Sequence, residues 1–194
     1  MSLPIELKWL EESTVCSGGV TWGVPWGKGA LHKNEEITLE NDRGEPVPVQ
    51  SWAQAYWPDG SVKWTGHAIT LKENKKRYYL KKGIPAKQAE CIRIKEDNAT
   101  VEINTGVITC LFNKTGASII QSLSMNGQVH CKNGTLVCIR EERSGRPGNM
   151  QLREESFESA VTEVTVEQQG PIRCVVKISG MHQAVGGIRR WLPF

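Results

Sequence analysis

The sequence predicts an all-β protein built from a small β-barrel followed by a second, sandwich-like β unit. Three observations support this prediction. Apolar residues almost never recur at helical spacing, short runs rich in Val, Ile, Thr, Trp and Tyr recur along the chain, and Gly, Asn, Asp and Pro separate these runs. Many short strands joined by regular turns are typical of barrels and sandwiches.

The predicted strands follow these apolar and β-branched runs. They cover residues 4–10, 19–24, 35–40, 47–57, 61–71, 76–80, 89–95, 99–103, 106–112, 117–124, 135–140, 158–167, 171–180 and 187–193. Turn signals fall at residues 42–44, 58–60, 104–106, 126–127 and 133–134. The charged segment 141–156 is predicted to be a long loop.

The clearest local prediction is a hairpin over residues 51–69. Its Pro58-Asp59-Gly60 sequence suits a type I turn with the glycine in the left-handed conformation, and it pairs Trp57 with Ser61. Alternation then creates two faces. The predicted core face carries Trp52, Tyr56, Val62, Trp64 and Ala68. The other face, predicted to meet solvent or a ligand, carries Trp57, Lys63, Thr65 and His67.

A domain boundary is predicted near residues 81–86, a basic stretch that contains Gly and Pro. Six of the seven Trp precede this stretch and only Trp191 follows it, which indicates two different cores. We assign residues 1–83 to the barrel and 87–194 to the second β-rich unit. Natural chains usually end in a polar tail, whereas this chain ends in an apolar aromatic pattern, so we expect a domain cut short.

Composition argues against two classes of partner. The net charge is only +3, from 24 basic and 21 acidic residues, which is too balanced for a nucleic-acid-binding surface. The sequence has no apolar run long enough for a membrane-spanning helix, so we expect no membrane contact. The start lacks a basic, then apolar, signal pattern, so we expect a cytoplasmic location; removal of a leader would leave the same sequence and allow export.

No cofactor or metal is expected. The six cysteines form no Cys-x-x-Cys pair and have no His at zinc-finger spacing, so we expect reduced thiols that are buried or half-buried. The sequence also lacks a phosphate-binding glycine loop, a Gly-x-Ser-x-Gly nucleophile motif and a His-Glu-x-x-His motif.

The aromatic composition is the one chemical indication of a ligand. Seven Trp outnumber the three Tyr and three Phe together, and indole rings stack on the C–H faces of sugars. Tryptophans in a small barrel also form its core. Trp26 and Trp57 each adjoin a proline turn, so we expect these two to be exposed. His67 lies along the same strand face as Lys63. The predicted substrate-binding residues are therefore Trp26, Trp57, Lys63 and His67, and no catalytic residue is assigned.

Two segments resemble a known family. The first is Val20-Thr21-Trp22-Gly23-Val24-Pro25-Trp26-Gly27-Lys28-Gly29, and the second is residues 49–64 with their unusual Trp57-Pro58-Asp59-Gly60-Ser61 core. Both resemble the amino-terminal RIFT-barrel domain of the exo-rhamnogalacturonan lyase, or YetA-like, family. Residues 167–180 are similar to strands that follow in those enzymes, so the resemblance covers nearly the whole chain.

The resemblance implies part of a bacterial lyase that cleaves the rhamnose–galacturonate backbone of pectin by β-elimination. It also implies a downstream helical toroid in the same parent chain and a polysaccharide or oligosaccharide substrate. Elimination needs a cation, a base and an acid around one uronate. We therefore expect this chain to be inactive alone. The alternative is a free-standing carbohydrate-binding module without catalysis.

Overall fold

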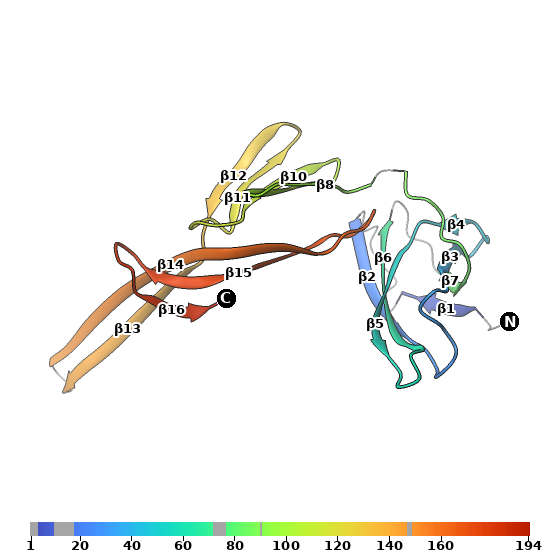
Figure 1. The fold of residues 1–194 in the computed structure, drawn as a ribbon, viewed down its shortest axis with the longest axis horizontal. Coiled ribbons are helices and arrows are strands. Elements are labelled where there is room, and N and C mark those ends of the chain that lie inside the picture. The colour runs from blue at the N-terminus through green and yellow to red at the C-terminus, as the bar shows by residue number, and fades with distance from the viewer. Residues whose placement is uncertain (1–3, 10–17, 72–76, 90, 147–148) are drawn as a thin grey trace. The chain divides into compact units, whose positions relative to one another are not determined.

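The computed structural model describes residues 4–9, 18–71, 77–89, 91–146 and 149–194. These residues form sixteen strands and no helix, which confirms the all-β prediction (Figure 1). The first seven strands are β1 (Ile5–Lys8), β2 (Gly18–Pro25), β3 (Ile37–Asn41), β4 (Pro46–Val47), β5 (Gln50–Tyr56), β6 (Val62–Leu71) and β7 (Arg77–Lys82). The remaining nine are β8 (Arg93–Glu96), β9 (Thr100–Asn104), β10 (Ile108–Asn113), β11 (Ile120–Met125), β12 (Gln128–Gly134), β13 (Val137–Arg146), β14 (Asn149–Gln168), β15 (Val175–Ala184) and β16 (Arg190–Pro193).

The chain divides into two compact units. The first comprises residues 1–91 together with 170–173, and the second comprises 92–169 and 174–194. Within the described ranges, no helix is long and apolar enough to span a membrane.

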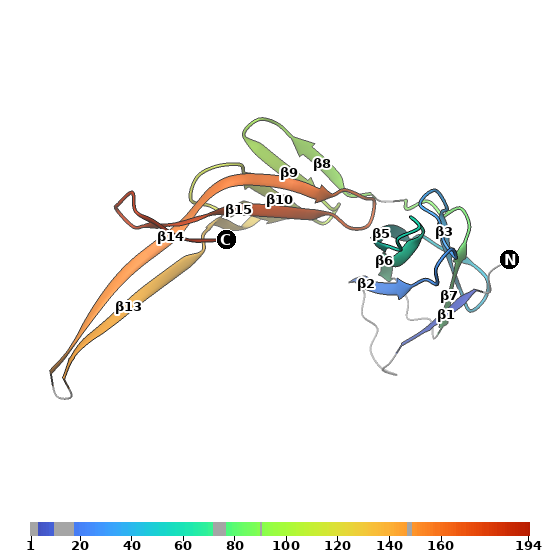
Figure 2. The same cartoon turned by 60° about the horizontal axis from the view of Figure 1, so that its bottom comes forward.

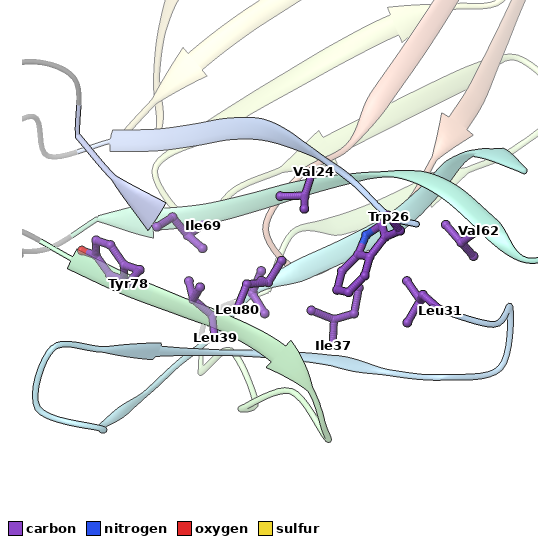
Figure 3. Packing of buried hydrophobic residues seen from close by; sticks show 10 residues of the cluster. Val24, Trp26, Leu31, Ile37, Leu39, Val62, Ile69, Tyr78 and Leu80 are labelled. Carbon is purple, nitrogen blue, oxygen red and sulfur yellow. The ribbon is translucent and has the colours of Figure 1, made fainter. Parts of the chain in front are cut away.

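The first unit consists of two antiparallel sheets around one core. One sheet has the order β2-β6-β5 and the other has the order β1-β7-β3-β4. Leu39 and Leu80, which pair across β3 and β7, have no accessible surface. Trp26 contributes its indole to the same cluster, beside Leu31 and Ile37 in Figure 3. The burial of these large side chains stabilises the unit at roughly 25 cal/mol per Å² of apolar surface.

The predicted hairpin turn between β5 and β6 is confirmed. The Trp57 amide donates to the Ser61 carbonyl over 2.8 Å, the Gly60 amide donates to the Trp57 carbonyl over 2.9 Å, and Gly60 has a φ of 82°. This positive φ is easily adopted only without a Cβ, which explains the glycine.

The predicted faces of this hairpin are wrong in part. Val62 and Ala68 are buried as expected, but Trp64 is 39% exposed and Tyr56 is 48% exposed, while His67 on the other face is fully buried. The register shifts twice, once between Ala53 and Ala55 and once between Ala55 and Tyr56. Each irregularity adds a residue to one strand and breaks the strict alternation of side chains on which the prediction relied.

The second unit also contains two antiparallel sheets, with orders β12-β11-β10-β9-β8 and β13-β14-β15-β16. Its core joins Val101 and Ile103 of β9 to Val161 and Val164 of β14. The five cysteines in the described residues are free, but Cys91 and Cys131 are exposed, which corrects the expected burial; Cys16 lies outside the described residues.

The long loop predicted over residues 141–156 is also wrong. Residues 141–146 belong to β13 and residues 149–156 belong to β14, and these two long strands pair antiparallel, as Figure 2 shows. Two pairs of opposite charge face each other across the ladder, Arg140 against Glu155 and Glu142 against Arg153, while Glu141 faces Glu154 between them. Opposite charges at directly facing positions favour strand pairing, so a charged composition did not indicate a loop.

We predict that Leu80→Ala destabilises the first unit by about 2–5 kcal/mol, because the removed side chain leaves a cavity at the centre of the β1-β7-β3 ladder. Denaturant unfolding followed by tryptophan fluorescence measures this loss. Ile84→Ala is the matched control, since Ile84 is 83% exposed, and it should change the stability by no more than about 0.5 kcal/mol. Equal effects of the two variants would contradict the assigned core.

Candidate functional site

The four predicted site residues all lie on or beside the three-stranded sheet of the first unit. Lys63 and His67 are on β6, Trp57 follows β5, and Trp26 follows β2. The structure therefore brings these residues to one sheet and its hairpin end. Their burial differs sharply, so they cannot all contact a ligand directly.

Trp57 and Lys63 form an accessible pair at the hairpin end. The Lys63 ammonium lies 4.7 Å from the centroid of the Trp57 ring, in the geometry of a cation–π contact. The Trp57 indole N–H donates to the Trp26 carbonyl over 3.0 Å, which fixes the ring. Trp57 is half-buried and Lys63 is exposed. The pair presents an apolar ring and a positive charge together.

Trp26 is buried, which corrects its expected exposure. Only 7% of its surface is accessible. Its backbone amide still donates to the Lys63 carbonyl over 2.9 Å, so the sheet pairing continues past Pro25 and turns the indole inward. The indole N–H donates to the Thr65 hydroxyl over 2.7 Å.

His67 is fully buried and is held by two hydroxyl groups. Its Nε2 lies 2.7 Å from Thr65 Oγ1, and its Nδ1 lies 2.9 Å from Ser51 Oγ. The Trp22 ring stacks on the imidazole with centroids 5.4 Å apart. Burial lowers the pKa of His67 to about 4, so the imidazole is neutral near pH 7.

The Ser51–His67 pair resembles a nucleophile beside a base, and its environment decides its role. Ser51 and Thr65 line an open pocket of about 190 Å³. A serine nucleophile needs a base whose protonated form is stabilised, usually by a carboxylate on the second ring nitrogen. In this structure that nitrogen meets the Thr65 hydroxyl, and burial disfavours the charged ring. The geometry therefore favours a structural hydrogen-bonded network that joins β2, β5 and β6, buried at Thr65 and His67 and exposed at Ser51.

The outer face of the same sheet carries two tryptophans that cross onto glycines. Gly23 of β2 pairs with Gly66 of β6. The Trp64 ring lies where a side chain on Gly23 would be, with Nε1 only 2.4 Å from the position of a Cβ. The Trp52 ring lies in the same way over Gly66, also at 2.4 Å. Sequence reasoning missed this face because both tryptophans were assigned to the core; glycines inside strands were the available signal.

Residues 170–173 of the first unit contact the same outer face. The Gln50 side-chain carbonyl accepts hydrogen bonds from the amides of Ile172 and Arg173, and its amide group donates to the Arg173 carbonyl over 3.0 Å. The Arg173 guanidinium lies 4.9 Å from the centroid of the Trp52 ring. A cation is thus held beside Trp52, one of the two outer tryptophans.

No metal centre emerges within the described ranges, where no group of three or more His, Cys, Asp or Glu side chains gathers as a ligand set. The acidic groups whose pKa is lowered serve local structure instead. Hydrogen bonds from the Ser61 hydroxyl and amide hold the pKa of Asp59 below its usual range in the hairpin turn.

Two family models match the chain. Residues 4–83 match the PcRGLX-like N-terminal RIFT barrel domain, and residues 92–194 match the central β-sandwich domain of PcRGLX-like proteins. The chain belongs to the PcRGLX-like family. This membership confirms the predicted order of a RIFT barrel followed by a β-sandwich, and it places the outer tryptophans and the buried His67 network in the RIFT barrel.

A relative extends the family match. The uncharacterized protein YetA of Bacillus subtilis (strain 168) is 40% identical to this chain over 191 residues, which are 97% of the chain. The matched region is 22% of YetA, so the chain spans about a fifth of that relative.

We predict that the RIFT barrel loses stability in mild acid because of His67. Its pKa is about 4 when folded and about 6.5 when unfolded, so the unfolded state binds the extra proton. The contribution of His67 to the free energy of unfolding is complete above pH 6.5 and is lost as the pH falls toward 4. The total loss is about 3 kcal/mol, at 1.36 kcal/mol per pKa unit.

Urea unfolding at several pH values between 4 and 7 measures this dependence. His67→Gln should flatten the slope in this window, whereas His32→Gln, on the surface, should leave it unchanged. An unaltered slope in the His67 variant would show that another group is responsible.

Proposed function

We propose that this chain is the amino-terminal β region of a polysaccharide lyase that cleaves rhamnogalacturonan by β-elimination. The observation that carries the proposal is the match of both halves of the chain, in order, to the PcRGLX-like RIFT barrel and β-sandwich. The much greater length of YetA supports a parent protein with further domains.

In this proposal the RIFT barrel binds glycan and does not perform the elimination. Trp57 and Lys63 offer an apolar ring and a cation at an accessible position, which suits a sugar that carries a carboxylate. Trp26 and His67 are buried, so we assign them a positioning role. Trp26 receives the Trp57 N–H at its carbonyl, and His67 holds Thr65, which in turn binds the Trp26 indole.

The chemistry supports a division of labour between this chain and the rest of its parent. Elimination requires a group that neutralises the uronate, a base for the C5 proton and an acid for the leaving oxygen, all held at reaction distance. The accessible Trp57–Lys63 pair supplies a cation but no carboxylate, imidazole or hydroxyl group. We therefore assign the base and the acid to the downstream helical region of the parent chain.

Absorbance of the unsaturated uronate tests the proposed reaction. The 194-residue chain should release no product from rhamnogalacturonan, whereas the longer parent protein should release it. In the parent, Lys63→Ala and Trp57→Ala should each raise KM by about tenfold with little change in kcat, because they remove binding and not chemistry. Ile84→Ala is the surface control and should leave both constants unchanged.

Two results would contradict this assignment. Turnover by the short chain alone would place the active site within these residues. Glycan binding by the short chain without any turnover by the parent would favour the non-catalytic binding module, a function that the exposed Trp64 also suits.

A further inference from the structure

On the outer face of the β2-β6-β5 sheet, two glycines leave space that two indole rings fill. Gly23 and Gly66 face each other across β2 and β6, and the indoles of Trp64 and Trp52 occupy the space above them. A Cβ on Gly23 would lie 2.4 Å from Trp64 Nε1, and a Cβ on Gly66 would lie 2.4 Å from Trp52 Cε2. Both rings therefore reach across one strand in the same direction, from β5 to β6 and from β6 to β2.

The two indoles are near neighbours because their glycines are paired. Directly opposed positions of an antiparallel pair have Cβ atoms about 4.5–5.5 Å apart. The edges of the two rings that lie over these positions are therefore separated by roughly one strand spacing. We call these two neighbouring rings the indole platform (Trp52 and Trp64).

The two halves of the indole platform differ in what covers them. The Arg173 guanidinium lies 4.9 Å from the centroid of the Trp52 ring. Trp64 keeps 39% of its surface accessible, which is a large fraction for an indole in a sheet. The open part of the platform is therefore Trp64, with a cation over the adjoining ring.

This combination selects a class of ligand. An accessible indole contacts the apolar C–H face of a pyranose ring, and a guanidinium binds a carboxylate through parallel N–H donors. We propose that the indole platform binds one acidic sugar residue, which stacks on Trp64 and places its carboxylate at Arg173. The proposal rests on the proposed glycan-binding function and adds a second contact surface beside the Trp57–Lys63 pair.

The indole platform differs chemically from the Trp57–Lys63 pair. The ring of Trp57 already has the Lys63 ammonium 4.7 Å from its centroid, and its N–H is bonded to Trp26. Trp64 contributes the exposed ring of the outer face. This ring fits there because Gly23 has no side chain.

Titration of the 194-residue chain with two matched probes tests the platform. One probe is an oligosaccharide of alternating rhamnose and galacturonate, and the other is the same oligosaccharide with its carboxylates reduced to alcohols. The acidic probe should bind at least about fivefold more tightly than the reduced one. Trp64→Ala should weaken both by about tenfold or more, which corresponds to about 1.4 kcal/mol. Arg173→Gln should abolish the preference for the acidic probe and keep binding of the reduced one, and Ile84→Ala should change neither.

Fluorine NMR makes the test independent of how well the alanine variant folds. The chain is labelled with 5-fluorotryptophan, and the Trp64 resonance is identified by its loss in Trp64→Phe. This resonance should shift on addition of the acidic probe. An unshifted Trp64 resonance, equal affinity for both probes, or unaltered affinity in a folded Trp64→Ala variant would overturn the proposal. The readout is binding, so lyase turnover by the parent protein can succeed or fail independently of it.

Discussion

The hydroxyl of Thr65 is the contact on which the RIFT barrel's three-stranded sheet depends. It receives the Trp26 indole N–H and lies 2.7 Å from His67 Nε2, while His67 Nδ1 meets Ser51 on the neighbouring strand. Buried polar groups are costly when they lose their partners, and the buried Thr65, His67 and Trp26 each have one. A slip of β6 by one residue would turn Thr65 and His67 outward and leave the Trp26 N–H without an acceptor. The network therefore fixes the register of β6 against β2 and β5.

That register determines the opposite face. With Thr65 and His67 inside, Trp64 and Gly66 must lie outside, because neighbouring residues of a strand alternate. Gly66 then faces Gly23 and leaves room for two indoles to cross the sheet. Glycine inside a strand is normally destabilising, and here the overlying rings offset that loss by covering the exposed backbone. The register of β6 therefore determines both the inner hydrogen bonds and the outer aromatic surface.

The structural features that depend only on residues close together in the sequence could be predicted from it. The all-β class and the Pro58–Gly60 turn follow from composition and turn chemistry, and both are confirmed. The faces of the hairpin could not be predicted in the same way, because two register shifts near Ala55 alter the alternation and no residue type announces them. The loop assigned to residues 141–156 failed for a related reason, since charge favours solvent until an opposite charge on the partner strand is known.

The site residues, too, could be predicted only in part from the sequence. Trp26 and Trp57 were grouped by their proline turns, and Lys63 and His67 by their strand face. All four do lie on one sheet and its end, yet burial divides them into two accessible and two buried residues. Burial is decided by distant partners such as Thr65 for Trp26, so it is invisible in the local sequence. Because β6 carries Thr65 and His67 inward and Trp64 outward, protonation of His67 acts on the strand that supports the indole platform.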